Sequence, residues 1–529
     1  MDILIKRAKI VDGTGELCYQ GDIGIKDDKI VEIGTINKEA KKIIDAGGRI
    51  VCPGFIDIHG HADLQILRDK TGQIKLRQGV TTEFIGNCGF SVAPLSVQYE
   101  KLLRDYCSPV MGDYQGSFGW KSYEEYVQYL KQQSLSHNIG LLVGNGTLRI
   151  AVKGFENGPL SDEEMSLVKK HLANALEAGA VGLSIGLMYS PENYYTTEEL
   201  IEICKIVNKY DGILVTHIRG EGNSLIKSIK EVIQIAKESD VPLHISHLKA
   251  AGKNNWQVAL DQVFEIIETE RASGLDITFD AYPYNAGSTT IASLLPPSVM
   301  VGGIDKAIQR MNDKETREKI VKELKEDADT WDNIVYQTGW QSVLISSVKS
   351  EKNKKIIGKT IQELAIEYNK EPEDIVIDLV IQEQGNVGIV IFHMSEDDVK
   401  RVIKSKYSVI ISDSLYDISG NPHPRLYNSF PKILCKYVKE EKLLSLEEAI
   451  KKMTYSPAKL FGVDRRGKIE VGYYADICII DMDRLKDNSD YINPAKYPEG
   501  IDVVIVNGKV AIEKGDLLSD YKGYLQLKN

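Results

Sequence analysis

A repeated unit of strand, loop and amphipathic helix fills the middle of the chain and constrains its fold more than any other feature. Short apolar runs typical of strands alternate with helical patterns, one of which, Ser161–Ala178, opens with a capping box. Such alternation is typical of a parallel sheet with helices outside it. Eight units favour a (β/α)8 barrel, and the alternative is a doubly wound open sheet. The predicted strands are 50–61, 81–88, 139–144, 181–186, 213–218, 243–248, 276–282 and 408–413.

The two ends of the chain carry a different pattern, of short β segments separated by turns. Neither end has enough strands for a stable sheet, so we expect one small β-sandwich domain built from 1–52 and 464–529. The catalytic barrel is then 53–463. About 125 residues separate its seventh and eighth strands, far more than a normal connection. This excess predicts an inserted subdomain at about 290–405, over the barrel mouth.

The bulk composition excludes several partners. The 529 residues carry a net charge of −11 and no basic run, which argues against nucleic acid. No apolar run is long enough to cross a membrane. Seven scattered cysteines do not form a disulfide framework, which favours a reducing compartment. We therefore expect a soluble cytoplasmic protein that acts on a small molecule, with homo-oligomer formation left open.

Metal-ligand residue types occur at the carboxyl ends of five predicted strands. In a barrel these ends meet at one face, where the active site forms. One such residue is more often structural, but five strands that all end this way are not expected by chance. Nitrogen, sulfur and oxygen donors together suit one or two Zn²⁺ ions. The candidates are His59, His61, Cys88, His217, His247 and Asp413.

Residues near these candidates are predicted from strand parity to point into the same mouth. Lys249 shares a face with His247, Tyr282 lies at the end of strand seven, and Pro422 and Pro424 frame a loop that presents Arg425. These groups suit a carboxylate ligand. The remaining histidines are predicted to be structural, and His244 is expected to face away from the barrel axis. They are His137, His171, His244 and His393, and His423 is interpreted as packing against or orienting the loop that carries Arg425.

With these residues in view, the chain resembles the amidohydrolase superfamily and, more closely, the D-aminoacylases (N-acyl-D-amino-acid deacylases). The resemblance covers essentially the whole chain. It rests on the paired histidines of strand one, the single histidines of strands five and six, and the strand-eight aspartate. It rests also on Gly86-Asn-Cys88-Gly89, Ile245-Ser-His247-Leu-Lys249, Tyr282-Pro-Tyr284 and His423-Pro-Arg425.

The resemblance implies a function and a role for each candidate. The chain would hydrolyse N-acyl-D-amino acids, or L-Xaa-D-Xaa dipeptides, with Asp413 moving the proton. A cyclic-amide hydrolase of the dihydropyrimidinase or hydantoinase kind is the alternative. Cys88, His217 and His247 would hold one tight zinc, and His59, His61 and Asp413 a second, weaker one. Substrate contacts are implied for Lys249, Tyr282 and Arg425 (carboxylate), Ser288 (a polar site position), Tyr189 (acyl group) and Met394 (side-chain pocket).

Overall fold

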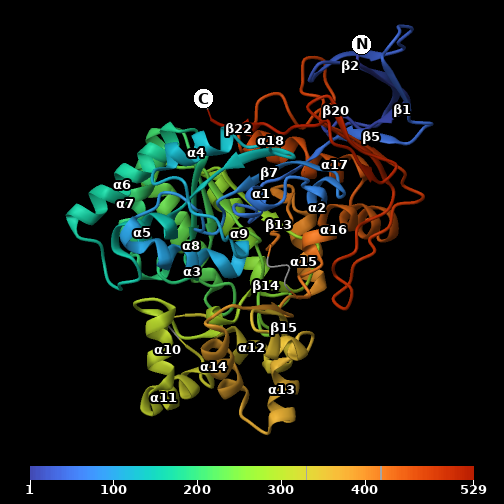
Figure 1. The fold of residues 1–529 in the computed structure, drawn as a ribbon. Coiled ribbons are helices and arrows are strands. Elements are labelled where there is room, and N and C mark those ends of the chain that lie inside the picture. The colour runs from blue at the N-terminus through green and yellow to red at the C-terminus, as the bar shows by residue number, and fades with distance from the viewer. Residues whose placement is uncertain (329–330, 417–419, 529) are drawn as a thin grey trace.

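A closed parallel β-barrel forms the centre of the computed structural model, which describes residues 1–328, 331–416 and 420–528. The parts of the predicted domains at 329–330, 417–419 and 529 lie outside the described residues. All eight predicted barrel strands are present, so the predicted fold class is confirmed (Figure 1). The strands are β6 (Phe55–Asp57), β7 (Val80–Ile85), β8 (Asn138–Leu141) with β9 (Val143–Gly144), β10 (Gly182–Gly186), β11 (Ile213–His217), β12 (Leu243–Ile245), β13 (Ile277–Ala281) and β17 (Ser408–Ile410).

The barrel closes between its first and last strands. The backbone N–H of Asp413 donates to the carbonyl of His59 at 2.8 Å, and that of His61 donates to Ser414 at 3.2 Å. These bonds exclude the open-sheet alternative, in which the first and last strands would not meet this way. They also bring His59 and Asp413, about 350 residues apart in the chain, to one point.

The first predicted strand, 50–61, is divided in the structure. Gly54 separates β5 (Ile50–Pro53) from β6, and a Cβ at Gly54 would lie 2.2 Å from the Thr81 hydroxyl oxygen, so no larger residue fits this bend. β6 then ends at Asp57, whose carboxylate accepts from the backbone N–H of Ser412 at 3.1 Å. The prediction that His59 and His61 lie on the strand was therefore wrong. They lie just beyond it.

Strands from both termini form one nine-stranded sheet beside the barrel, as expected (Figure 1). The junction is the antiparallel pair of β5 and β18, in which Cys52 lies opposite Cys478. The domain boundaries at 52 and 464 stay a prediction. The sheet contains β1 (Ile3–Ile10), β2 (Tyr19–Lys26), β3 (Lys29–Gly34), β4 (Lys42–Asp45), β5, β18 (Ile477–Ile480), β19 (Ile501–Val506), β20 (Lys509–Glu513) and β21 (Asp516–Leu517).

The insertion between β13 and β17 has a sheet and an apolar cluster of its own. Its antiparallel strands are ordered β14 (Gly287–Thr290), β16 (Val387–Ile391) and β15 (Val343–Val348). In Figure 1 it forms the lobe, coloured from yellow-green to orange, on the side of the barrel away from the terminal sheet. Its helices are α10 (Ile304–Asn312), α11 (Lys314–Leu324), α12 (Ile334–Thr338), α13 (Ile361–Tyr368) and α14 (Pro372–Glu383).

Amphipathic helices cover the outside of the barrel. The predicted capping box of Ser161 and Glu164 is present at the start of α6, and Thr196 and Glu199 form another at the start of α7. Among the described residues no helix is long and apolar enough to cross a membrane. The covering helices include α3 (Glu100–Met111), α4 (Tyr123–Lys131), α5 (Asn145–Lys153), α6 (Asp162–Glu177), α7 (Thr197–Lys209), α8 (Leu225–Ser239), α9 (Ala259–Ala272), α15 (Glu396–Lys404) and α17 (Leu446–Met453).

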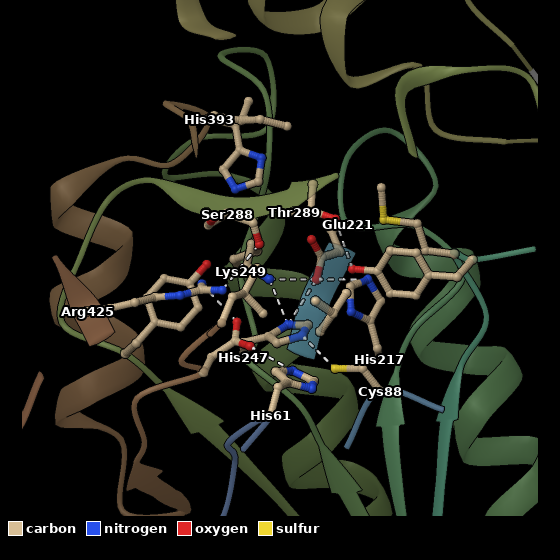
Figure 2. Close-up of a pocket in the computed structure, with 18 of the residues that line it drawn as sticks. His61, Cys88, His217, Glu221, His247, Lys249, Ser288, Thr289, His393 and Arg425 are labelled. Atoms are coloured by element: carbon tan, nitrogen blue, oxygen red, sulfur yellow. Dashed lines mark hydrogen bonds and ion pairs between the residues drawn. The ribbon is translucent and has the colours of Figure 1, made fainter. Parts of the chain in front are cut away.

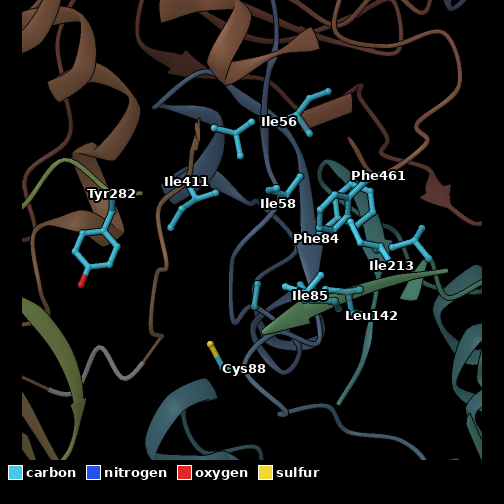
Figure 3. Packing of buried hydrophobic residues seen from close by; sticks show 14 of the residues in the cluster. Ile56, Ile58, Phe84, Ile85, Cys88, Leu142, Ile213, Tyr282, Ile411 and Phe461 are labelled. Carbon is cyan, nitrogen blue, oxygen red and sulfur yellow. The ribbon is translucent and has the colours of Figure 1, made fainter. Parts of the chain in front are cut away.

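Apolar side chains fill the barrel below the mouth. The Phe84 and Phe461 rings meet edge to face, with centroids 4.8 Å apart. Figure 3 shows this pair beside Ile85 and Ile213, with Cys88 beyond one end of the cluster. Such dense packing fixes the strand ends above it. The barrel therefore offers a rigid floor for side chains that follow its strands.

Candidate metal centre

Six predicted ligand side chains gather at the carboxyl ends of the barrel strands, and Figure 2 labels four of them, His61, Cys88, His217 and His247. His59 Nε2 lies 3.2 Å from the Cys88 sulfur, and His247 Nε2 lies 3.6 Å from it. Asp413 Oδ1 lies 3.3 Å from His61 Nε2 and 3.5 Å from His59 Nε2. Ligands that share one tetrahedral zinc at about 2.1 Å lie about 3.4 Å apart. The spacing therefore suits zinc.

Three overlapping groups of metal-ligand atoms fit within this cluster. His59, His61 and Asp413 form one, which is also the set implied for a second zinc. His59 joins Cys88 and His247 in another, where the resemblance implied His217. His217 instead groups with His247 and Glu221.

Buried nitrogen atoms in the cluster lack partners. Within the described residues neither ring nitrogen of His217 has a hydrogen-bond partner, nor does Nδ1 of His61, although both side chains are buried. An unpaired buried polar atom costs about 1–3 kcal/mol, so such atoms need an explanation. A bound metal ion gives one, and the residues present fit it.

Backbone strain accompanies three of the candidates. Cys88, His247 and Asp413 have φ angles of 52°, 34° and 48°, in the left-handed region that non-glycine residues rarely adopt. Such residues cost about 1–3 kcal/mol each and cluster at functional sites. Because the chain turns here, strand parity cannot be extended from β7, β12 and β17 to these side chains.

The carboxylate of Asp280, on β13, supports the cluster from below. It lies 3.3 Å from His59 Nδ1 and 2.9 Å from His244 Nε2, and it accepts the backbone N–H of His247. Burial alone would raise the pKa of Asp280, but His59 and His244 outweigh it and hold the pKa below its usual range. The expectation that His244 faces away was wrong, because the turn at His247 breaks the parity that it assumed.

Electrostatics favour the ionised forms of the two anionic candidates. Burial raises the pKa of the Cys88 thiol, but His59 and the other histidines more than reverse this and lower it well below its usual range. In the same way Arg425, with His59 and His61, outweighs burial and keeps the pKa of Asp413 well below normal. A thiolate is the form of cysteine that binds metal.

The predicted carboxylate contacts surround a cavity above the cluster. Lys249 Nζ lies 2.6 Å from Glu221 and 2.7 Å from His247 Nδ1. Arg425 Nη1 lies 2.8 Å from Asp413, and its guanidinium carbon lies 4.7 Å from the Tyr282 ring centre. Both cations therefore already face anions in this cavity.

The loop that carries Arg425 is held by His423. Its Nδ1 accepts the backbone N–H of Arg425 at 3.0 Å, and its Nε2 donates to the carbonyl of Ala286 at 3.0 Å. This supports the interpretation that His423 orients the loop. Arg425 itself is 1% exposed, so its guanidinium is directed by packing.

The other predicted substrate residues lie in two different cavities. Ser288 and Tyr189 line the cavity, and the Tyr189 hydroxyl lies 3.4 Å from that of Thr289. Met394 lies in a smaller cavity behind His247 and Lys249. Its neighbour His393, predicted to be structural, lines the main cavity instead.

Among the titratable residues that line this cavity, sequence reasoning missed His393 and Glu221. Glu221 follows β11 by four residues and reaches the site through a loop flanked by Gly220 and Gly222. The two glycines were the only local signal. His393 comes from the insertion and lies 20 residues before Asp413. Apart from Ile391, no cavity residue lies near it in the chain, so parity gave no signal for it.

Fold and site together define a metal-dependent hydrolase of the barrel class. Such enzymes hold their metal with nitrogen, sulfur and oxygen donors of this kind at the carboxyl ends of the barrel strands. The particular family is set by comparison. The amidohydrolase family model matches residues 42–332 and 351–512, and the chain belongs to this family.

Two relatives from Alcaligenes xylosoxydans xylosoxydans match nearly the whole chain. A D-aminoacylase and an N-acyl-D-glutamate deacylase are each 32% identical to it, over 96% of this chain and 93% of theirs. A D-aminoacylase crystal structure superposes with a TM-score of 0.84 at 30% identity, covering both chains fully. The N-acyl-D-glutamate deacylase of Bordetella bronchiseptica, complexed with zinc and a phosphonate inhibitor, gives 0.83 at 27% identity, covering 100% of this chain and 99% of that one.

Proposed function

We propose that the chain is a zinc-dependent hydrolase that cleaves the amide bond of N-acyl-D-amino acids to a carboxylate and a free D-amino acid. The observation that carries this proposal is the cluster of Cys88 with four histidines and Asp413 beneath a cavity lined by Lys249 and Arg425. The relatives with D-aminoacylase and deacylase names, matched over 96% of the chain, support it.

The same cluster supports zinc as the metal. We assign one tight zinc and a second, weaker site to the six candidate ligands. When bound, Zn²⁺ polarises the scissile carbonyl and lowers the pKa of water. The free thiol of Cys88 is best preserved in a reducing compartment such as the cytoplasm.

Asp413 is the proposed proton carrier. Its carboxylate lies at the cavity floor and is held in the ionised form, so it can accept a proton from the attacking water. Returning that proton to the leaving nitrogen completes the cleavage. Arg425, paired with Asp413 at 2.8 Å, limits how far the carboxylate can turn.

Lys249, Tyr282 and Arg425 are the proposed carboxylate clamp, with Ser288 beside it. The positive charges of Lys249 and Arg425 lie in the cavity itself, in a chain whose net charge is −11. Substrate binding would exchange the Lys249–Glu221 contact for a Lys249–substrate contact. With Tyr189 near the acyl group, the clamp sets which face of the α-carbon meets the metal.

A comparison of stereoisomers tests the proposal. The zinc-loaded protein should hydrolyse N-acetyl-D-amino acids and leave their L isomers largely intact, as measured by release of the free amine. Ring opening of hydantoin or dihydropyrimidine at a comparable rate would instead favour the cyclic-amide alternative. Hydantoinases share the fold, with a TM-score of 0.57 at 17% identity.

A further inference from the structure

The imidazole of His393 is a buried polar group without a hydrogen-bond partner among the described residues. It is 5% exposed and lines the main cavity, and within the described part of the chain neither of its ring nitrogens has a hydrogen-bond partner. Most buried polar side-chain atoms do have one. The missing partner is therefore expected in the cavity itself.

The backbone around His393 is fixed, although its ring is free. Its carbonyl accepts from the backbone N–H of Gly252 at 3.0 Å and from the Trp256 indole at 2.9 Å. The ring passes over Gly287, where a Cβ would lie 2.9 Å from His393 Nε2. Figure 2 shows it above Ser288, on the side of the cavity away from His61. Gly287 thus leaves the space that lets the ring reach the cavity.

The surroundings of His393 keep it neutral. Burial, together with the nearby charges of Lys249 and Arg425, lowers the pKa of His393 to about 3. A neutral imidazole has one N–H donor and one acceptor nitrogen. His393 therefore offers a hydrogen bond without adding a positive charge to the cavity.

Other residues are already assigned to the carboxylate and the acyl group of the substrate. A carboxylate has two oxygens, and the clamp supplies the fork of Arg425, the ammonium of Lys249 and the hydroxyl of Tyr282. The acyl group is assigned to the side of Tyr189. The substituent on the α-carbon is the group without an assigned contact, and His393 lines the cavity with both ring nitrogens unpaired among the described residues.

We propose that His393 determines specificity by hydrogen-bonding the side chain of the D-amino acid, so that neutral polar side chains (hydroxyl or carboxamide) are preferred over apolar ones of similar shape. This inference rests on the proposed deacylase function. An apolar side chain would leave both imidazole nitrogens unpaired, which is how a site rejects an analogue that lacks the matching group.

Matched substrate pairs test the inference on the zinc-loaded full-length protein. The pairs are N-acetyl-D-asparagine with N-acetyl-D-leucine, and N-acetyl-D-serine with N-acetyl-D-2-aminobutyrate. We expect the wild type to favour the polar member of at least one pair by about 10-fold in kcat/KM. His393→Leu should remove this preference, and His393→Gln, which keeps a neutral donor and acceptor, should retain most of it.

Three results separate the outcomes. A polar-to-apolar ratio that is the same in wild type and His393→Leu overturns the inference and leaves the deacylase function intact. No turnover of any N-acetyl-D-amino acid by the wild type overturns both. His171→Leu, outside the site, is the matched control and should leave the ratio unchanged. If His393→Leu fails to fold, His393→Met is the apolar variant, and zinc content verifies that each variant retains the metal site.

Discussion

Two buried polar clusters lie next to each other where the first and last strands of the barrel meet. They differ in whether all of their polar atoms have partners. In the lysine cluster, defined as Lys75, Asp57, Glu83, His137, Ser412 and Ser414, every side chain has partners. Lys75 Nζ lies 2.9 Å from Ser412 and 2.8 Å from Ser414, and it pairs with Asp57 and with Glu83. Glu83 in turn lies 3.1 Å from His137. A fully satisfied cluster of this kind is structural.

The candidate metal cluster starts at His59, two residues after Asp57 and beyond the end of β6, and it is incomplete. His217 and His61 have unpaired nitrogens among the described residues, and Cys88, His247 and Asp413 adopt strained backbone angles. Both clusters are equally buried and rich in charge. The difference teaches that burial and charge do not distinguish these two clusters, whereas unpaired atoms together with backbone strain do.

The largest expected effect concerns chemistry in the incomplete cluster. Asp413→Asn should lower kcat by about 10²–10⁴-fold, because an amide cannot accept the proton. The tightly held zinc, measured by metal analysis, should be retained. Cys88→Ala is the contrasting variant and should lose zinc. A near-normal rate for Asp413→Asn would show that another group is the base.

The lysine cluster should respond through stability. Lys75→Met leaves Asp57 and Glu83 buried without their cation, and breaking a buried ion pair in this way costs about 3–5 kcal/mol. Urea unfolding of the two proteins measures the difference. A loss below about 1 kcal/mol would mean that the cluster is weaker than its geometry indicates.

The difference in unfolding free energy between the wild type and Lys75→Met should change with pH in one direction. Burial raises the pKa of Glu83, but Lys75 and His137 outweigh it and lower the pKa below its usual value. The resulting stability is present above the unfolded-state pKa of about 4.3 and is lost as pH falls through the folded-state value. Without Lys75, protonation relieves the buried charge. The gap between wild type and Lys75→Met should therefore narrow as pH falls from 7 to about 4.

The smallest effect should come from Arg425→Lys, which keeps the charge and loses the fork. For free-acid substrates we expect kcat/KM to fall by an amount that corresponds to about 1.5–3 kcal/mol of transition-state free energy, the range for hydrogen bonds to charged groups. Substrates with an amide-capped carboxyl should change little, and zinc content should not change. Because Arg425 also contacts Asp413, equal losses on both substrates would show that it acts through Asp413 and not on the carboxylate.

Much of the fold was predictable because it depends on local pattern. The alternation of strands and helices gave the barrel, and the long gap before β17 gave the insertion. The metal-ligand types at the strand ends identified His59, His61, Cys88, His217, His247 and Asp413 as neighbours. Parallel strands in a barrel bring their carboxyl ends together whatever the loops do, so this part of the site needed no three-dimensional information.

What only the tertiary structure decided lies where the chain leaves a regular element. The bend at Gly54 and the left-handed turns at Cys88, His247 and Asp413 break the parity on which sequence reasoning depends. His393 and Glu221 enter the cavity from an insertion and a loop, and Met394 turns away from it. Their placement follows from how separate units pack against each other, and no local periodicity of the chain records that packing.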